Sequence, residues 1–215
     1  MEGDPNSLRT LEWYVKELFS GNSNNEQIQK IHKSLESFSC QKGAWRNSLY
    51  FLNQTNQYQT AMFSLTVLEG FITKGWHGLS SEEQIELRTT LYHWILENHS
   101  TSPYFIRNKA IQLVVHIERC DWPDRYPDFY SNILSLVSSP SPSTTVVGLL
   151  FLQTASEELG TPRDDVLSSR KTELKQRLLH FVPQTLSVLT GIKLLSDLYC
   201  VQNGCLNFVA PHRFT

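Results

Sequence analysis

Residues 103–127 read PYFIRNKAIQLVVHIERCDWPDRYP, and this stretch decides the fold class. Pro103 suits the first turn of a helix, where its missing N–H is not needed. The apolar residues that follow recur at i, i+4, i+7, i+8 and i+11, which is one stripe of an α-helix: Ile106, Ala110, Leu113, Val114 and Ile117. Because a residue before proline is pushed out of the α region, Asp121-Trp122-Pro123 ends this helix. The stretch therefore predicts a helix, a sharp corner and a second helix that begins at Pro123.

Rings and one charge on this stretch indicate that it lies inside a stack of helices. The corner carries large apolar rings that need a neighbouring layer to bury them: Trp122, Tyr126 and Phe129. We interpret these rings as core rather than as a platform for a peptide. Arg107 sits beside the apolar stripe, so we expect it to pair with a carboxylate of a neighbouring repeat, a direct contact with a partner being the alternative. The candidate carboxylates are Asp121, Asp128, Glu157 and Glu158.

The rest of the chain repeats the helical pattern, and no strand pattern competes with it. Apolar residues recur at helical spacing between turn signals. Capping residues mark three of the starts: Asn6 or Ser7, Asn24 or Asn25, and Ser80 or Ser81 with Glu83 behind it. The expected helices cover roughly residues 7–19, 25–38, 44–53, 58–72, 81–95, 103–121, 123–137, 143–159 and 164–182. Pro183 is expected to end or kink the last of these, and another apolar segment covers 185–201.

Helices of about 15 residues, arranged in pairs that repeat near every 40 residues, are typical of HEAT-like or armadillo-like hairpins. We therefore predict an all-α solenoid of about four to five hairpins. Residues 1–100 and 101–202 are expected to form two consecutive groups of hairpins. Residues 203–215 have neither a helical stripe nor a cap, and we expect an irregular or truncated tail there.

The composition argues against several classes of protein. The formal net charge of the 215 residues is −2, so no overall positive field attracts nucleic acid or an anionic membrane surface. The four cysteines form no C-x-x-C pair, which favours reduced thiols over a metal site or a disulfide framework. No run reaches the ~18 consecutive apolar residues of a membrane helix. The N-terminal residues also lack the apolar core of a secretory signal, so we expect a soluble protein of the cell interior.

The sequence carries no catalytic or metal-binding motif. The phosphate-binding loop, the dinucleotide fingerprint, G-x-S-x-G and H-E-x-x-H are absent. His93 and His99, six residues apart on one predicted helix, do not share a face. The adjacent residues Glu157 and Glu158 point about 100° apart, so we expect one to be buried or paired and the other solvated. We expect no enzyme activity, no metal and no cofactor.

A basic set gathers on and before the ninth predicted helix: Arg163, Arg170, Lys171, Lys175, Arg177 and His180. Acidic neighbours dilute this set: Asp164, Asp165 and Glu173. A solvated face is our first interpretation, and a contact for an acidic partner is the second.

An ordered series of short motifs carries a resemblance to a known family. The series comprises Gly43-Ala44-Trp45-Arg46, Leu49-Tyr50-Phe51-Leu52, Arg107-Asn108-Lys109, Asp121-Trp122-Pro123 with Tyr126-Pro127 and Phe129, Ser156-Glu157-Glu158-Leu159, Pro162-Arg163-Asp164-Asp165, and Arg170-Lys171 with Glu173-Leu174. In this order the motifs resemble the exportin branch of the importin-β-like nuclear transport receptors. The resemblance covers roughly residues 8–192. It implies importin-β N-terminal-like HEAT repeats over residues 1–100 and exportin-1-like HEAT repeats over 101–202.

The resemblance also implies partners. Such receptors bind Ran in its GTP state, protein cargo and nuclear pore proteins, and they shuttle between nucleus and cytoplasm. The implied cargo is actin with profilin. Ran would be held by the inward-facing second helix of each pair, on polar positions that we expect to be exposed: Gln27, Lys30, Tyr58, Gln59, Lys109, Gln112 and His116.

Two other functions stay open at this point. One is a HEAT or armadillo scaffold unrelated to transport, such as a regulatory subunit, which would not distinguish Ran-GTP from Ran-GDP. The other is an all-helical enzyme, which needs a deep pocket with converging titratable groups.

Overall fold

The computed structural model describes residues 4–20, 24–160 and 167–202, with side chains described as far as Lys193. Within these ranges the chain forms nine α-helices and one short 3-10 helix, and no strand occurs in them. The elements are α1 (Pro5–Ser20), α2 (Asn25–Ser39), α3 (Ala44–Gln54), α4 (Tyr58–Lys74), η1 (Trp76–Gly78), α5 (Ser81–Asn98), α6 (Tyr104–Asp121), α7 (Phe129–Val137), α8 (Pro142–Gly160) and α9 (Ser168–Gln202). The tail predicted for 203–215 lies outside the described residues.

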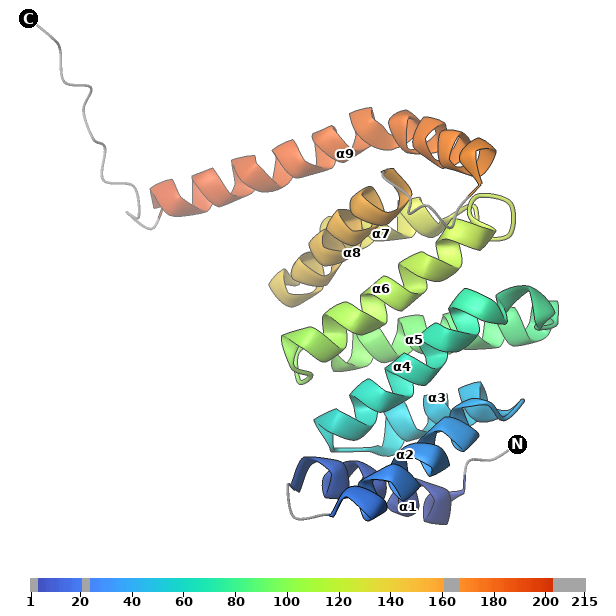
Figure 1. The fold of residues 1–215 in the computed structure, drawn as a ribbon. Helices are drawn as coiled ribbons and strands as arrows, with labels where there is room; N and C mark the ends of the chain where they lie inside the picture. Colours follow the sequence, from blue (N-terminus) through green and yellow to red (C-terminus); the bar gives the residue numbers. More distant parts are fainter. Residues whose placement is uncertain (1–3, 21–23, 161–166, 203–215) are drawn as a thin grey trace, which may run out of the picture.

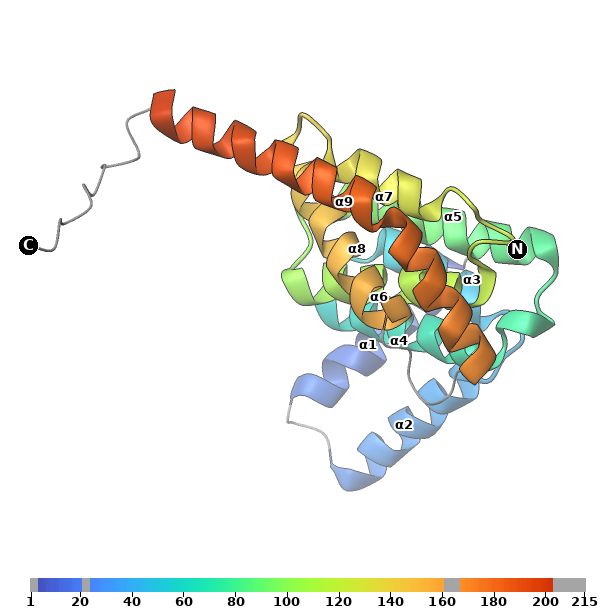
Figure 2. The same cartoon turned by 90° about the horizontal axis from the view of Figure 1, so that it is seen from above.

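The helices stack in antiparallel pairs, as the all-α solenoid prediction requires. Each pair contributes one helix to each of two layers. Helices α2, α4, α6 and α8 form one layer, and α1, α3, α5 and α7 form the other (Figure 1). We call the α2–α4–α6–α8 side the inner face. Helix α9 packs across α7 and α8, and its second half extends beyond the stack (Figures 1 and 2). The fold is a HEAT-like solenoid, which confirms the predicted fold class.

Local hydrogen bonds explain where three of these helices begin. Ser80 forms the predicted capping box with Glu83, and Asn24 is the predicted cap of α2, where it also forms a capping box with Gln27. The predicted cap of α1 was wrong, because Asp4 takes that role. Its carboxylate accepts the N–H groups of residues 6 and 7 at 3.0 and 3.1 Å, and the bond from residue 6 is the main cause that lowers the pKa of Asp4.

The corner after α6 is longer than predicted. Helix α6 does end at Asp121, but α7 begins at Phe129 rather than at Pro123. The physical reason is a second proline, Pro127. In a helix that began at Pro123, residue 127 would have to donate a backbone hydrogen bond, but proline has no N–H to donate. The intervening residues form turns that bury Trp122, whose ring lies 6.2 Å from that of Tyr130. The core interpretation of the corner rings therefore holds for Trp122 and Phe129, which are both buried.

The end of the chain also differs from the prediction. We expected Pro183 to end or kink the helix predicted over 164–182, with a separate apolar segment over 185–201. Helix α9 runs through Pro183, so the expected end is wrong and the kink is the alternative that fits. The proline removes one hydrogen bond, and Figures 1 and 2 show α9 bent between its two halves.

Arg170 fastens the start of α9 to the end of α6. Its guanidinium donates to the carbonyl oxygens of Arg119 at 3.1 Å, Cys120 at 3.5 Å and Trp122, and to Glu173 Oε2 at 2.8 Å. The last carbonyls of a helix have no partner within the helix, so this fork satisfies groups that burial would leave unpaired. Arg170 is therefore not part of a solvated basic face, whereas Lys175, Arg177 and His180 are exposed and Arg163 lies outside the described residues.

We expect Arg170→Lys to destabilise the docking of α9 by about 1.5–3 kcal/mol, because one ammonium cannot replace a planar fork that reaches several carbonyls. Hydrogen exchange of the α9 amides, read together with urea unfolding, measures this loss. Lys175→Ala, on the exposed side of the same helix, is the matched control and should leave exchange unchanged. Equal exchange in the two variants would show that the fork does not hold α9 in place.

Apolar side chains form two separate clusters along the stack. The larger one runs from α3 to the first part of α9. The smaller one joins α1, α2 and α3 and has its own buried centre: Leu11, Val15, Ile31, Leu35 and Phe51. The first hairpin therefore packs on the rest of the solenoid through a smaller core, a feature that shapes the surface described below.

Candidate functional site: the inner face

Polar side chains on α6 link the three central helices of the inner face. Lys109 Nζ lies 2.6 Å from Glu69 Oε1 on α4, and Gln112 Nε2 donates to Glu158 Oε1 on α8 at 3.4 Å. Lys109 and Gln112 are one turn apart, so they face the same side of α6. They hold neighbouring helices in register along the face where partner binding was predicted.

A more buried polar group continues this row toward the end of α6. His116 Nε2 lies 3.4 Å from Glu158 Oε1, and Arg119 Nη1 lies 3.6 Å from Glu158 Oε2. His116 is only 3% exposed, so the expectation that it is an exposed position was wrong. A helix inside a layer has a neighbour on each side as well as its paired helix, and therefore the side opposite its apolar stripe is partly covered. The expectation that one of Glu157 and Glu158 is paired and the other solvated is confirmed, because Glu158 makes these contacts and Glu157 is exposed.

The other predicted positions lie on α2 and α4. Gln27 belongs to the capping box of α2, where its side chain accepts the N–H of Asn24 at 3.2 Å. Lys30 is exposed and pairs with Glu26 at 2.7 Å within its own helix. Tyr58 and Gln59 open α4 and are both exposed. Gln27 and Lys30 line a hollow between α2 and α1, on the other side of α2 from His32 and Glu36. The seven predicted residues therefore lie on three helices of one layer, but the structure does not gather them into one compact cluster.

The pairing predicted for Arg107 is wrong. Its Nε donates to Asn108 Oδ1 at 3.3 Å, and among the described residues it makes no ion pair. The reason is its place in the first turn of α6. Asp121 lies about 21 Å further along that helix at 1.5 Å per residue, and Glu158 contacts the same distant end. The residue that joins neighbouring repeats at this end of α6 is Lys109.

Asp121, the last residue of α6, is instead the centre of a buried polar network at the C-terminal end of that helix. Its carboxylate accepts Nε1–H of Trp76 at 3.0 Å and Nη1–H of Arg88 at 3.3 Å. The guanidinium of Arg88 lies 4.4 Å from the centre of the Tyr126 ring. Glu118 is fully buried beside this network and interacts with Arg88 and Asp121 through its charge rather than through a hydrogen bond. The motif residues Asp121 and Trp122 therefore have structural roles here, in line with the interpretation of the corner rings as core.

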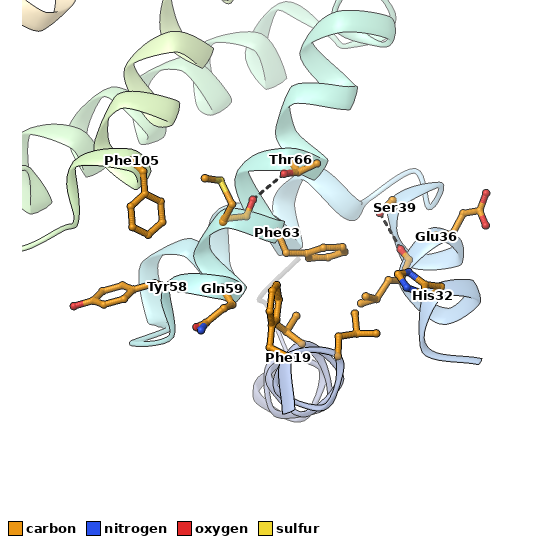
Figure 3. Close-up of a pocket in the computed structure, with 13 residues that line it drawn as sticks. Phe19, His32, Glu36, Ser39, Tyr58, Gln59, Phe63, Thr66 and Phe105 are labelled. Carbon is orange, nitrogen blue, oxygen red and sulfur yellow. Dashed lines mark hydrogen bonds between the residues drawn. The ribbon is translucent and has the colours of Figure 1, made fainter. Parts of the chain in front are cut away.

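An open apolar groove lies at the N-terminal end of the inner face (Figure 3). We call it the N-terminal groove. It has a volume of about 790 Å³, and its walls come from three helices with one further residue from α6. Its lining residues are Val15, Leu18 and Phe19 of α1, His32, Leu35, Glu36 and Ser39 of α2, Tyr58, Gln59, Met62, Phe63 and Thr66 of α4, and Phe105 of α6.

Sequence reasoning placed Tyr58 and Gln59 on this face but missed the groove. The signal that was available is the excess of rings at helix ends, because Phe19 ends the stripe of α1 and Phe105 precedes the stripe of α6. In the structure Phe19 is 72% exposed, Tyr58 53% and Phe105 40%. Large exposed apolar side chains that gather in one place are typical of interaction sites.

Other site types find no support in the part of the chain that the structure describes. No group of three or more histidine, cysteine or acidic side chains converges there to hold a metal ion. The described helices include none that combines the length and the apolar character needed to span a membrane. Cys40 is an exposed free thiol, and Cys120 is exposed as well. What these ranges offer chemically is an extended polar face with an apolar groove at one end, which suits binding of a large partner.

Two family models match the chain in succession. Residues 31–97 match the importin-beta N-terminal domain, and residues 103–209 match the exportin 1-like protein family. Together the two matches span α2 to α9, so they include all four helices of the inner face apart from the first residues of α2.

Individual relatives align over most of the chain. It is 45% identical to exportin-6 of Mus musculus and 43% identical to exportin-6-A of Xenopus laevis, each over 192 residues, which is 89% of this chain. It is 26% identical to exportin-6 of Dictyostelium discoideum over 175 residues, or 77% of the chain. The chain spans 17% of the length of the mouse and frog relatives and 16% of the Dictyostelium one.

Proposed function

The chain belongs to the exportin branch of the importin-β-like nuclear transport receptors, and from this premise we propose that its inner face binds Ran in the GTP state. The observation that carries the proposal is the alignment with exportin-6 at 45% identity over 192 residues, which takes in both layers of the solenoid. The match to the importin-beta N-terminal domain supports the same assignment for the first hairpins. We keep residues 1–100 and 101–202 as its two proposed parts.

The transport cycle is part of the same proposal. The receptor carries protein cargo from nucleus to cytoplasm, contacts nuclear pore proteins on the way and so resides in both compartments. The resemblance to exportin-6 implies actin with profilin as the cargo. If Ran and cargo both favour one curvature of the solenoid, each raises the affinity for the other by the same factor.

Among the predicted Ran contacts, exposure separates the better candidates from the poorer ones. Lys30, Tyr58 and Gln59 are exposed, whereas Lys109 and Gln112 are partly buried in contacts between helices. His116 is a poor candidate for direct contact, because its ring is buried beside Glu158.

We expect the chain to bind Ran loaded with a non-hydrolysable GTP analogue and to bind Ran-GDP at least about tenfold more weakly, a difference of about 1.4 kcal/mol. Isothermal titration with both nucleotide states measures this preference. Equal binding of the two states would contradict the proposal and favour the general HEAT scaffold.

Single variants then test the face itself. Lys30→Ala should weaken binding of Ran-GTP several-fold without lowering the unfolding midpoint, because exposed Lys30 has only the surface pair with Glu26 to lose. Lys16→Ala on α1, in the other layer, removes the same charge from an exposed site and should leave the affinity unchanged. A loss of equal size in both variants would point to non-specific charge attraction instead of the inner face.

A further inference from the structure

We propose that the N-terminal groove binds an amphipathic helix of a partner protein, one that presents large apolar side chains on one face with lysine or arginine beside them. This inference goes beyond Ran binding, and the two residues on which it is tested, Phe19 and Glu36, are not among the candidate Ran contacts.

The shape of the groove follows from how the first hairpin packs. Helices α4 and α6, and again α6 and α8, pack closely side by side, whereas the backbones of α2 and α4 come close at few points at most. They approach one another near Phe38 and Phe63, whose ring centroids are 6.2 Å apart. On the inner face the spacing of neighbouring helices therefore widens between α2 and α4, with α1 beneath. A helix laid between two others completes this kind of three-sided trough.

The lining of the groove matches the apolar face of such a helix. Phe19 and Phe63 point into the space between the helices, as Figure 3 shows. The hydroxyls of Ser39 and Thr66 donate to carbonyl oxygens of their own helices at 2.8 and 3.0 Å, so they are already satisfied. A volume of about 790 Å³ falls within the range of protein pockets that bury a ligand, and it accepts several large side chains at once.

A negative charge on the rim of the N-terminal groove favours a partner helix that carries positive charge. Glu36 is the one carboxylate among the lining residues, no lysine or arginine accompanies it there, and it makes no ion pair within the described residues. His32 lies one turn earlier on the same side of α2. An approaching helix with lysine or arginine next to its apolar face gains an attraction to Glu36, and an acidic helix is repelled.

The probe for this proposal is a synthetic 18-residue helix of leucine and lysine, with leucine at i, i+3, i+4 and i+7, carrying a fluorescent label. One comparison peptide has glutamate in place of lysine, and another has the same composition as the probe in an order that spreads the leucines around the helix. Fluorescence anisotropy with the whole chain, in the absence of Ran, should give saturable binding of the probe and about tenfold weaker binding of either comparison peptide.

Variants locate the binding. Phe19→Ser should weaken binding of the probe about tenfold, because the change removes an exposed ring at the mouth of the groove and little of the apolar core. Ile85→Ser, a similarly exposed apolar side chain on α5, is the matched control and should bind like the wild type. Glu36→Lys should invert the preference, so that the glutamate peptide binds more tightly than the lysine peptide.

Several outcomes would overturn the proposal. One is equal binding by Phe19→Ser and the wild type, and another is binding of the lysine and glutamate peptides with the same affinity. A third is concentration-dependent self-association in sedimentation velocity that Phe19→Ser abolishes, which would assign the groove to a second copy of this chain. Because Ran is absent throughout, these results are independent of the transport proposal.

Discussion

Adding one methyl group at Gly148 should destabilise the fold by about 3 kcal/mol, since it forces two helix backbones apart. Gly148 is buried in the first half of α8, where that helix crosses the end of α7. A Cβ atom at this position would lie 2.5 Å from the backbone nitrogen of Val137 and 2.8 Å from the carbonyl carbon of Leu136. Backbone atoms cannot rotate away as a side chain can, so Gly148→Ala must separate α8 from α7. Urea unfolding followed by circular dichroism measures the loss as a lower midpoint.

The chain offers a glycine that should respond in the opposite direction. Gly70 lies inside α4, and a Cβ atom added there meets nothing within 4 Å. Gly70→Ala should therefore raise the stability by about 0.5–1 kcal/mol through the better helix propensity of alanine. A Gly148→Ala variant within about 0.5 kcal/mol of the wild type would show that α7 and α8 separate without cost, and that their close approach is not needed.

The close approach at Gly148 also shows which parts of this fold the sequence makes predictable. Periodicity and capping are local, so the helix at Tyr104–Asp121, the cap at Asn24 and the capping box at Ser80 could be predicted directly. The pairing of helices followed from their lengths and short turns. Nothing local distinguishes Gly148 from Gly70, because only the partner helix decides whether a methyl group fits.

The candidate site was less predictable for the same reason. A helical wheel sorts residues by one apolar side, but a helix of the inner layer has neighbours on several sides. His116 was therefore expected to be exposed although it is buried against Glu158, and Arg107 was assigned a partner that lies at the far end of its helix. The groove depends on how far α2 stands from α4, a distance that no residue pattern in either helix encodes.

Glu118 gives the second prediction with a large expected effect, which concerns the dependence of stability on pH. Its side chain is fully buried in α6, and neither carboxylate oxygen has a hydrogen-bond partner among the described residues. Burial raises the pKa of Glu118 well above its ordinary value of 4.5, Asp121 raises it further, and Arg88 lowers it. Arg88 already pairs with Asp121 at 3.3 Å, so its charge is shared between the two carboxyl groups.

The sign of the effect follows from proton linkage. Below about pH 4.5 the carboxyl of Glu118 is protonated in both the folded and the unfolded chain, and its contribution is fully present. As the pH rises, the unfolded chain releases this proton while the folded chain retains it, so unfolding becomes easier. This residue then lowers the free energy of unfolding by up to about 1.4 kcal/mol per pH unit, until the pH reaches the raised pKa of the folded state.

Glu118→Gln should remove this dependence, because the amide has nearly the shape of the protonated carboxyl and does not titrate. We therefore expect the variant to gain stability over the wild type progressively between about pH 4.5 and neutral pH in urea unfolding. Glu118→Met, which has a similar volume and no titrating group, should flatten the same part of the curve, and it controls for any hydrogen bond that the amide itself makes. Wild-type and Glu118→Gln curves that stay parallel over this range would mean that Glu118 keeps its proton no more tightly in the folded chain than in the unfolded one. In that case Arg88 would have to hold a carboxylate at position 118 as well as that of Asp121, and Arg88→Met would then destabilise the chain most at neutral pH.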